Sequence, residues 1–206
     1  MSQVTHGIRS ILSHPYFYDL TQKILGAGRS RQKLVREYIR PKDGDQLLDI
    51  GCGTAELLPY LPRGLHYVGF DLSQPYIDAA RRRYGDRGRF ECMDVAHFED
   101  PSVQGADIVL AIGILHHLDD DLAEALISTA HDKLKPGGRL ITIDGTLTHT
   151  QSKAARSLIL RDRGQNIRSP AGYRTIAERR FDHVQMTVRE DMLFVPYTHC
   201  ILECTR

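Results

Sequence analysis

Long apolar runs are missing from this chain of 206 residues. None approaches the roughly 20 residues that a helix needs to cross a bilayer, which argues against a membrane-spanning protein. The first ten residues lack the apolar core and the small-residue cleavage site of a signal peptide. The formal net charge is only +1, so the molecule as a whole has no strong field toward nucleic acid or a membrane. We therefore expect a cytoplasmic protein.

Cysteines are few, and their spacing excludes two common kinds of site. The four thiols are scattered, and no pair has the spacing of zinc ligands or of a redox motif. Reduced thiols are the simplest interpretation. Internal repeats and low-complexity tracts are missing as well. Hydrophobic residues make up 41% and charged residues 26% of the chain, as in an ordinary globular protein of one domain.

Short apolar segments alternate with segments of helical pattern through most of the chain. The expected strands are residues 46–50, 66–70, 89–92, 107–112 and 139–143, with Lys135–Gly138 as a turn into the last of these. The expected helices run from Ser73 to about Tyr84 and from about Asp120 to Leu134, and a short helix is expected after the Gly-Cys-Gly turn at 51–53. Alternation of this kind predicts an α/β fold, a parallel sheet with helices on both faces.

The two ends of the chain differ from this pattern. Residues 15–40 predict one or two helices, broken near Gly26–Gly28. Residues 183–192 and 197–204 predict two strands joined by a short turn at Pro196, and strands joined so closely must be antiparallel. We expect one domain over 1–206, a Rossmann-like seven-stranded sheet that ends in an antiparallel hairpin. Residues 1–40 would form a helical lid and 150–180 a helical insertion on the acceptor side.

The clearest chemical signal is the glycine turn after the first strand. Residues Leu47–Thr54 run from a strand into Gly-Cys-Gly, and Asp71 ends the second strand twenty residues after Gly51. A glycine turn lets the backbone approach a ligand, and the acid can accept both hydroxyls of a ribose. A dinucleotide site requires a third glycine where this chain has Glu56, an acid that repels phosphates. The pattern disfavours NAD and favours a cofactor with ammonium and sulfonium charges, S-adenosylmethionine.

Five segments in this order resemble the class I S-adenosylmethionine-dependent methyltransferases. They are the first motif Asp49–Thr54, Asp71 as the ribose-binding acid, Met93–Val95, Ala111–Leu118 and Leu134–Gly138. The resemblance covers roughly residues 30–145 by motifs and extends to 206 by the order of elements. It implies a Rossmann-like fold and direct displacement at the sulfonium methyl group. The implied cofactor-binding residues are Asp49, Gly51, Cys52, Gly53, Asp71, Leu72, Met93, Asp94, Val95, Ile112 and Gly113.

Each of these residues also has a simpler structural interpretation. Asp49 could cap a turn, Asp71 could be an ordinary acid at a strand end, and Asp94 could cap the next helix, although the resemblance places it at the adenine amine. Cys52 is a small packing residue rather than a nucleophile, because nothing basic is placed to activate it. His116 and His117 could lie on the surface, or one of them, His116 in preference, could be the catalytic base.

Other catalytic motifs do not fit after the fourth strand. The N/D-P-P-Y/F motif of enzymes that methylate adenine or glutamine is replaced by Gly113-Ile-Leu-His. A magnesium-dependent catechol site requires carboxylates at the ends of the fourth and fifth strands, and only Asp144 is present. We expect no metal, and we expect Asp144 to border the acceptor.

An arginine-rich segment follows the fifth strand. Residues 153–180 contain eight Lys or Arg against Asp162 and Glu178, an excess of +6. The segment is either a solvated helix face or part of the acceptor pocket, where arginine clamps carboxylate or phosphate. The candidate acceptor ligands are Arg161, Arg163, Arg168 and Arg174. Aromatic residues, which would stack on nucleic acid bases, do not alternate with these cations.

These observations together predict a methyltransferase for a small, anionic acceptor. Near the N-terminus, Tyr18 lies in an aromatic group that forms either a core or a lid over the acceptor. The sheet ends the chain, so we expect no appended domain to grip a macromolecule. Two alternatives stay open: a methyltransferase for protein or RNA, and a protein that binds S-adenosylmethionine without transferring the methyl group. The sequence leaves the oligomeric state undetermined.

Overall fold

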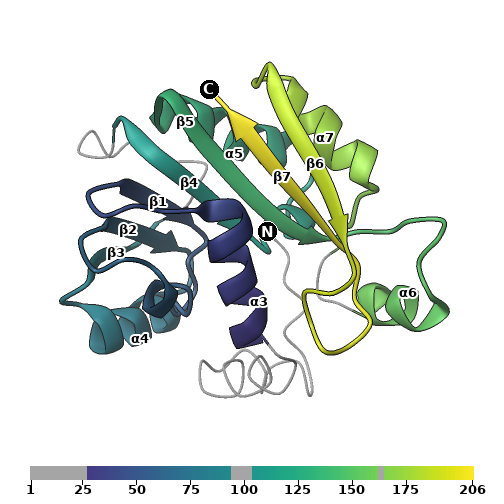
Figure 1. Cartoon of the computed structure of the whole chain (residues 1–206), viewed down its shortest axis with the longest axis horizontal. Helices are drawn as coiled ribbons and strands as arrows, with labels where there is room; N and C mark the ends of the chain where they lie inside the picture. Colours follow the sequence, from purple (N-terminus) through teal and green to yellow (C-terminus); the bar gives the residue numbers. More distant parts are fainter. Residues whose placement is uncertain (1–26, 94–103, 162–164) are drawn as a thin grey trace.

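The computed structural model describes residues 27–93, 104–161 and 165–206 (Figure 1). They form one seven-stranded sheet in the order β3-β2-β1-β4-β5-β7-β6. The strands are β1 Gln46–Ile50, β2 His66–Asp71, β3 Gly88–Cys92, β4 Ala106–Ile112, β5 Leu134–Gly145, β6 His183–Arg189 and β7 His199–Thr205. The first five are parallel, and β7 is antiparallel to both β5 and β6. The predicted α/β sheet with its closing hairpin is confirmed.

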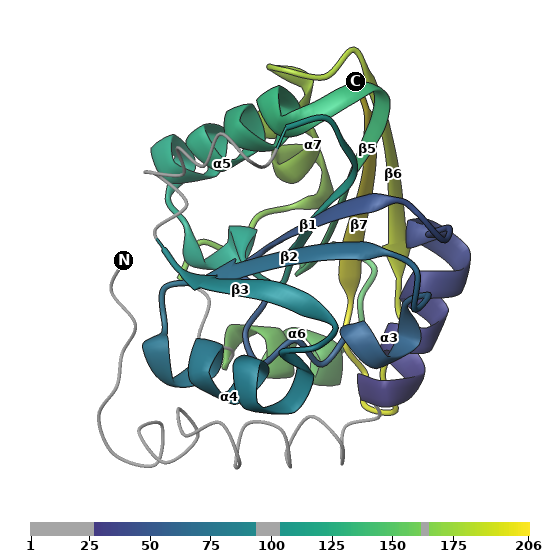
Figure 2. The same cartoon turned by 90° about the vertical axis from the view of Figure 1, so that its left-hand side faces the viewer.

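Helices cover both faces of the sheet (Figure 2). α5 (Asp120–Lys133) and α7 (Pro170–Glu178) lie on one face, and α3 (Ala27–Leu34) and α4 (Gln74–Tyr84) lie on the other. A π-helical turn, η1 (Val35–Ile39), continues α3. Each face has its own apolar core, because β1 and β4 are buried on both sides as central parallel strands are. No helix in the described ranges is long and apolar enough to cross a membrane.

The arginine-rich segment divides into two helices with different surroundings. α6 (Lys153–Leu160) and α7 are separated by a connection whose described part, from Gln165 to Ser169, is not helical. Tyr173, Ile176 and Ala177 of α7 are buried in the core that α5 covers. α7 is thus a core helix, and the acceptor-side role of residues 150–180 stays a prediction.

The turn before β5 is part of the strand rather than a separate turn. β5 begins at Leu134, which pairs with Ala106, and the register then jumps so that Arg139 pairs with Ile108. The residues between form a bulge, where Gly137 has a φ of +76°. A Cβ on Gly138 would lie 2.8 Å from the Ala106 oxygen, so the close approach of the two strands requires glycine there.

The segment after the glycine turn also differs from the prediction. Sequence patterns indicate a short helix there, but only a single 3-10 turn forms, η2 (Leu58–Tyr60). The preceding loop instead has left-handed backbone at Gly51, Gly53 and Ala55, with φ of 74°, 55° and 57°. No α-helix in the fully described stretch 51–65 begins at this loop, and none supplies an N-terminal dipole for a pyrophosphate.

Candidate active site

The loop after β1 is tied to the end of β2 by the Asp71 carboxylate. Its Oδ2 accepts a hydrogen bond from the Gly53 amide at 3.0 Å, and its Oδ1 accepts one from the Ser73 amide at 2.8 Å. Burial raises the pKa of Asp71, and the two backbone hydrogen bonds oppose that rise. Each carboxylate oxygen keeps a free lone-pair direction beyond its backbone donor. This geometry suits an acid that receives further hydroxyl donors.

Asp49, near the end of β1, is more deeply buried, with 3% exposure. Its Oδ2 accepts a hydrogen bond from the Tyr67 hydroxyl at 2.7 Å. Burial raises the pKa of Asp49 to about 7, the Tyr67 hydrogen bond lowers it, and the negative charge of Asp71 raises it again. Within the described residues neither carboxylate pairs with Lys or Arg, so the charge here remains open to a cationic ligand.

Cys52 lies between these two acids in the glycine loop. Burial raises the pKa of its thiol, and the negative charges of Asp49 and Asp71 raise it further. A thiol kept protonated is a poor nucleophile, which agrees with the prediction of a packing role.

The segment after β4 lies directly against the glycine loop. A Cβ on Gly51 would lie 2.8 Å from Cδ1 of Ile114, so the loop approaches this segment as closely as glycine allows. Gly113, with a φ of 67°, ends β4 and donates its amide to the Ile143 oxygen at 2.8 Å. The first motif and the post-β4 segment, predicted to share a site, are therefore neighbours at the carboxyl edge of the parallel strands. Ligands of open α/β sheets bind at this edge.

His116 and Asp144 form a buried pair beside Gly113. Nδ1 of His116 lies 2.8 Å from Oδ1 of Asp144, and the His116 amide donates to the same oxygen at 3.2 Å. The other oxygen, Oδ2, is buried and has no hydrogen-bond partner among the described residues. A buried carboxylate with one partner favours a proton on Nδ1, which leaves Nε2 as the basic nitrogen. The centroid of the His117 ring lies 4.1 Å from that of His116, with the two ring planes tilted by 41°.

Arg168 holds the backbone around His116 instead of projecting into solvent. Its guanidinium donates to the oxygens of Leu115 and Leu118, each at 2.8 Å, and pairs with Asp120 at 2.7 Å. The Asn166 amide donates to the His116 oxygen at 3.0 Å. The connection between α6 and α7 thereby fixes η4 (Leu115–His117), the turn that carries both histidines.

Two other predicted acceptor residues lie within the described ranges. Arg174 pairs with Glu178 on its own helix at 2.6 Å, and Arg161 is exposed at the end of α6. Tyr18 and Arg163 lie outside the described residues, as do Asp94 and Val95 of the cofactor set.

Three other cofactor candidates flank the site. Leu72 is exposed, and Met93 donates its amide to the Asp71 oxygen at 3.1 Å. Ile112 is half-buried at the end of β4. The sequence patterns do not predict a role for Tyr67, although glycines lie beside its ring on β2 and β3.

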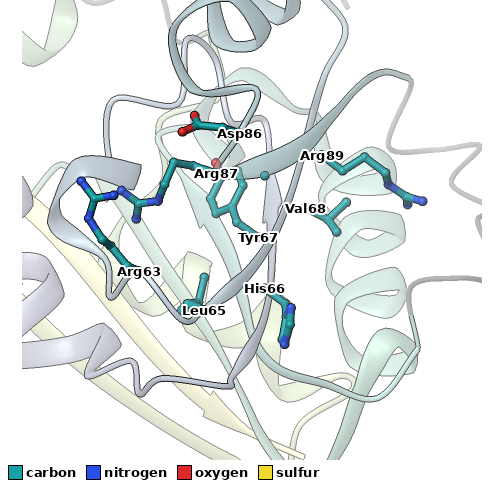
Figure 3. A pocket seen from close by; sticks show the side chains of 9 residues that line it. Arg63, Leu65, His66, Tyr67, Val68, Asp86, Arg87 and Arg89 are labelled. Carbon is teal, nitrogen blue, oxygen red and sulfur yellow. The ribbon is translucent and has the colours of Figure 1, made fainter.

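A cavity of about 530 Å³ lies at the opposite edge of the sheet, at the amino ends of β2 and β3 (Figure 3). Its lining includes Arg63, His66, Arg87 and Arg89, and Arg87 donates to main-chain oxygens of residues 58–62. Of the residues that line this cavity, Tyr67 is the one that also contacts an acid of the carboxyl edge, Asp49. The chemistry of the carboxyl edge is therefore separate from this cavity.

Comparisons with known proteins agree with the geometry of the carboxyl edge. Residues 48–140 match a family described as a methyltransferase domain. The chain is 29% identical over 118 residues to a probable fatty acid methyltransferase of Mycobacterium tuberculosis, covering 56% of this chain and 28% of that protein. It is 33% identical over 107 residues to demethylspheroidene O-methyltransferase of Rhodobacter capsulatus, covering 48% of this chain and 25% of that protein.

These matches support a class I S-adenosylmethionine-dependent methyltransferase. The cofactor of this family is S-adenosylmethionine. Among solved structures, a TehB-like methyltransferase of Corynebacterium glutamicum has the same fold, with a TM-score of 0.66 and 20% identity over 94% of this chain and 99% of that chain. The chain spans about a quarter of the length of the two curated relatives above.

The residues at the carboxyl edge fit a cationic cofactor. Asp49 is buried and Asp71 is half-buried, both carboxylates can supply negative charge, and a Cβ on Gly53 would meet nothing within 4 Å, so the loop leaves room beside it. Glu56 pairs with Arg83 and lies 3.9 Å from Arg31, so these cations offset part of the charge on which the prediction against phosphates rests. The missing helix after the loop is the stronger argument against a pyrophosphate-bearing cofactor.

Proposed function

We propose that this chain transfers the methyl group of S-adenosylmethionine to a small organic acceptor. The observation that carries the proposal is the carboxyl edge, where the Asp71-bound glycine loop contacts the segment that holds the His116–Asp144 pair. The two acids proposed to bind the cofactor, Asp49 and Asp71, and a candidate base thereby lie at one edge of the sheet.

The proposed cofactor ligands are those that the motifs predict. They are Asp49, Gly51, Cys52, Gly53, Asp71, Leu72, Met93, Asp94, Val95, Ile112 and Gly113. Asp71 would receive the ribose hydroxyls, and the loop backbone would lie against the ligand. The sulfonium centre of the cofactor supplies a methyl group that is activated for direct displacement. The protein contributes proximity and orientation, which are worth about 7–11 kcal/mol of a barrier.

His116 is the proposed base, with Asp144 as the residue that orients it. The acceptor loses its proton to Nε2 of His116 as it attacks the methyl carbon, and the products are the methylated acceptor and S-adenosylhomocysteine. Asp144 was predicted to touch the acceptor. Its bond to Nδ1 of His116 supports a positioning role instead. His117, half-buried and in ring contact with His116, is the alternative base.

A small acceptor is supported by the relatives, whose names refer to fatty acids and to demethylspheroidene. Fewer observations support a negatively charged acceptor, because acidic side chains pair with several of the cations of residues 153–180. Arg168 pairs with Asp120, Arg174 with Glu178 and Arg179 with Glu124. An acidic acceptor would then rely on Arg161 and Arg163, with Tyr18 as part of a lid formed by residues 1–40.

A mass search identifies the acceptor directly. The protein is incubated with a cell metabolite extract and S-adenosylmethionine whose methyl group carries deuterium. We expect at least one extract compound to gain a deuterated methyl group, with equal formation of S-adenosylhomocysteine. The control is the His116→Ala variant, which should form the product far more slowly. Labelled protein or RNA without a labelled metabolite would replace the small-molecule acceptor by a macromolecule.

A further inference from the structure

Tyr67 lies on the amino-terminal half of β2, yet its hydroxyl reaches the cofactor-side acid of β1. Asp49 pairs in register with Gly69, two residues farther along β2. The Tyr67 ring must therefore lie along the strand for its hydroxyl to donate to Asp49 Oδ2 at 2.7 Å. Both side chains are buried, each residue being 3% exposed.

Two glycines provide the space for this ring. A Cβ on Gly69 would lie 2.8 Å from Cε1 of Tyr67, and a Cβ on Gly88 of β3 would lie 2.8 Å from Cδ1. Gly88 is the register partner of Tyr67. Figure 3 shows the ring at the edge of the cavity described above. Any other residue at either position would move the ring and, with it, the hydroxyl.

The other groups around the Asp49 carboxylate do not favour its negative charge, whereas the Tyr67 hydroxyl does. Asp71 on β2 is negative, Cys52 of the loop is a half-buried thiol, and the β4 partner of Asp49 in register is the apolar Leu110. Burial and Asp71 both raise the pKa of Asp49, whereas the hydrogen bond from Tyr67 lowers it. Among the described residues, Tyr67 is thus the group that favours the ionised carboxylate.

We propose that Tyr67 is a positioning residue for cofactor binding, whose hydroxyl orients Asp49 and stabilises its negative charge for the cationic cofactor. The inference rests on the proposed function, because it assigns Asp49 to the cofactor. Tyr67 would act on the cofactor only through the Asp49 carboxylate, to which its hydroxyl donates.

The Tyr67→Phe variant tests the proposal through the pH dependence of affinity. S-adenosylhomocysteine is the probe, because it carries the ammonium group and is not consumed. Without the hydroxyl, the pKa of Asp49 rises above its value of about 7, so less of the carboxylate is ionised at pH 6. We expect the Kd to increase about 10-fold relative to wild type at pH 6, and about 2-fold or less at pH 8.5, where the carboxylate is largely ionised in both proteins.

Tyr38→Phe is the matched control. It removes the hydroxyl of another buried tyrosine, one that Arg189 contacts at 2.7 Å. This variant should bind with wild-type affinity at both pH values. Gly88→Ala keeps the Tyr67 hydroxyl but displaces the ring, and it should reproduce the loss at pH 6. It serves as the second variant if Tyr67→Phe does not fold.

Each outcome separates this inference from the proposed function. Wild-type affinity in folded Tyr67→Phe at pH 6, or an equal loss at pH 6 and pH 8.5, would overturn the positioning role and leave the proposed function intact. Absence of binding by the folded wild-type protein would overturn both. If neither variant folds, the wild-type protein is titrated at both pH values. The role of Asp49 requires the affinity to weaken as the pH falls from 8.5 to 6, and an affinity that does not weaken would overturn the roles of Asp49 and Tyr67.

Discussion

Replacing His116 with alanine is expected to lower the turnover number for methyl transfer about 10²- to 10⁴-fold, the usual contribution of a general base. The Kd of S-adenosylmethionine should stay within about 2-fold of wild type, because the hydrogen bonds to Asp71 come from Gly53 and Ser73. The measurement is single-turnover formation of labelled product with the acceptor that the mass search identifies.

The neighbouring histidine is the matched control. His117 is on the same 3-10 turn and its ring contacts that of His116, but the bond to Asp144 is formed by His116. His117→Ala should therefore retain most of the activity. Asp144→Asn should lower turnover without changing cofactor affinity, and it should alter the pH dependence of turnover, which a purely structural role does not predict. Full activity in both single histidine variants would leave a mechanism by proximity alone.

Replacing Asp71 with alanine is expected to weaken cofactor binding by about 1.5–3 kcal/mol, the contribution of hydrogen bonds to a charged group. This corresponds to an increase of about 10- to 150-fold in the Kd of S-adenosylmethionine. The carboxylate would contact the ribose, and it also holds the Gly53 and Ser73 amides, so the variant loses part of the loop geometry as well.

Asp86→Ala controls for the loss of one carboxylate at the opposite edge of the sheet. Asp86 is an exposed acid that follows α4, at the amino end of β3. Isothermal titration of both variants gives the comparison, after circular dichroism has shown that each is folded. If folded Asp71→Ala binds the cofactor as tightly as Asp86→Ala does, Asp71 does not bind the cofactor.

The fold was largely predictable because its signals are local. Apolar runs such as 107–112 identify buried parallel strands, and the short turn near Pro196 allows only an antiparallel hairpin. The error at the glycine turn has a local cause too. Sequence patterns do not reveal that Ala55 adopts a left-handed conformation, which leaves only a 3-10 turn where a helix was expected.

The site was predictable only where motifs determine the backbone. Asp71 meets Gly53 as the motif predicts, since strand ends and glycine turns fix main-chain positions. Arg168 shows the opposite case, because its partners Leu115 and Leu118 lie about fifty residues earlier in the chain. A run of arginines does not disclose whether each guanidinium meets a ligand, an acid or a carbonyl.

Tyr67 illustrates a signal that is present in the sequence but can be interpreted only with the register known. Gly69 and Gly88 are unremarkable separately, and both lie within strands, where glycine is usually unfavourable. Once β2 and β3 are aligned, the two glycines flank one aromatic ring and leave it room to reach Asp49. Glycines that face the same aromatic residue across neighbouring strands therefore deserve inspection for a polar partner.

Isothermal titration of the folded wild-type protein tests the central claim most directly. S-adenosylmethionine, S-adenosylhomocysteine and NAD are titrated separately at pH 8. The acids Asp49 and Asp71 and the absence of a helix at the glycine loop predict saturable binding of both adenosyl ligands and none of NAD. A folded protein that gives no heat with either adenosyl ligand, or that binds NAD instead, would contradict the account.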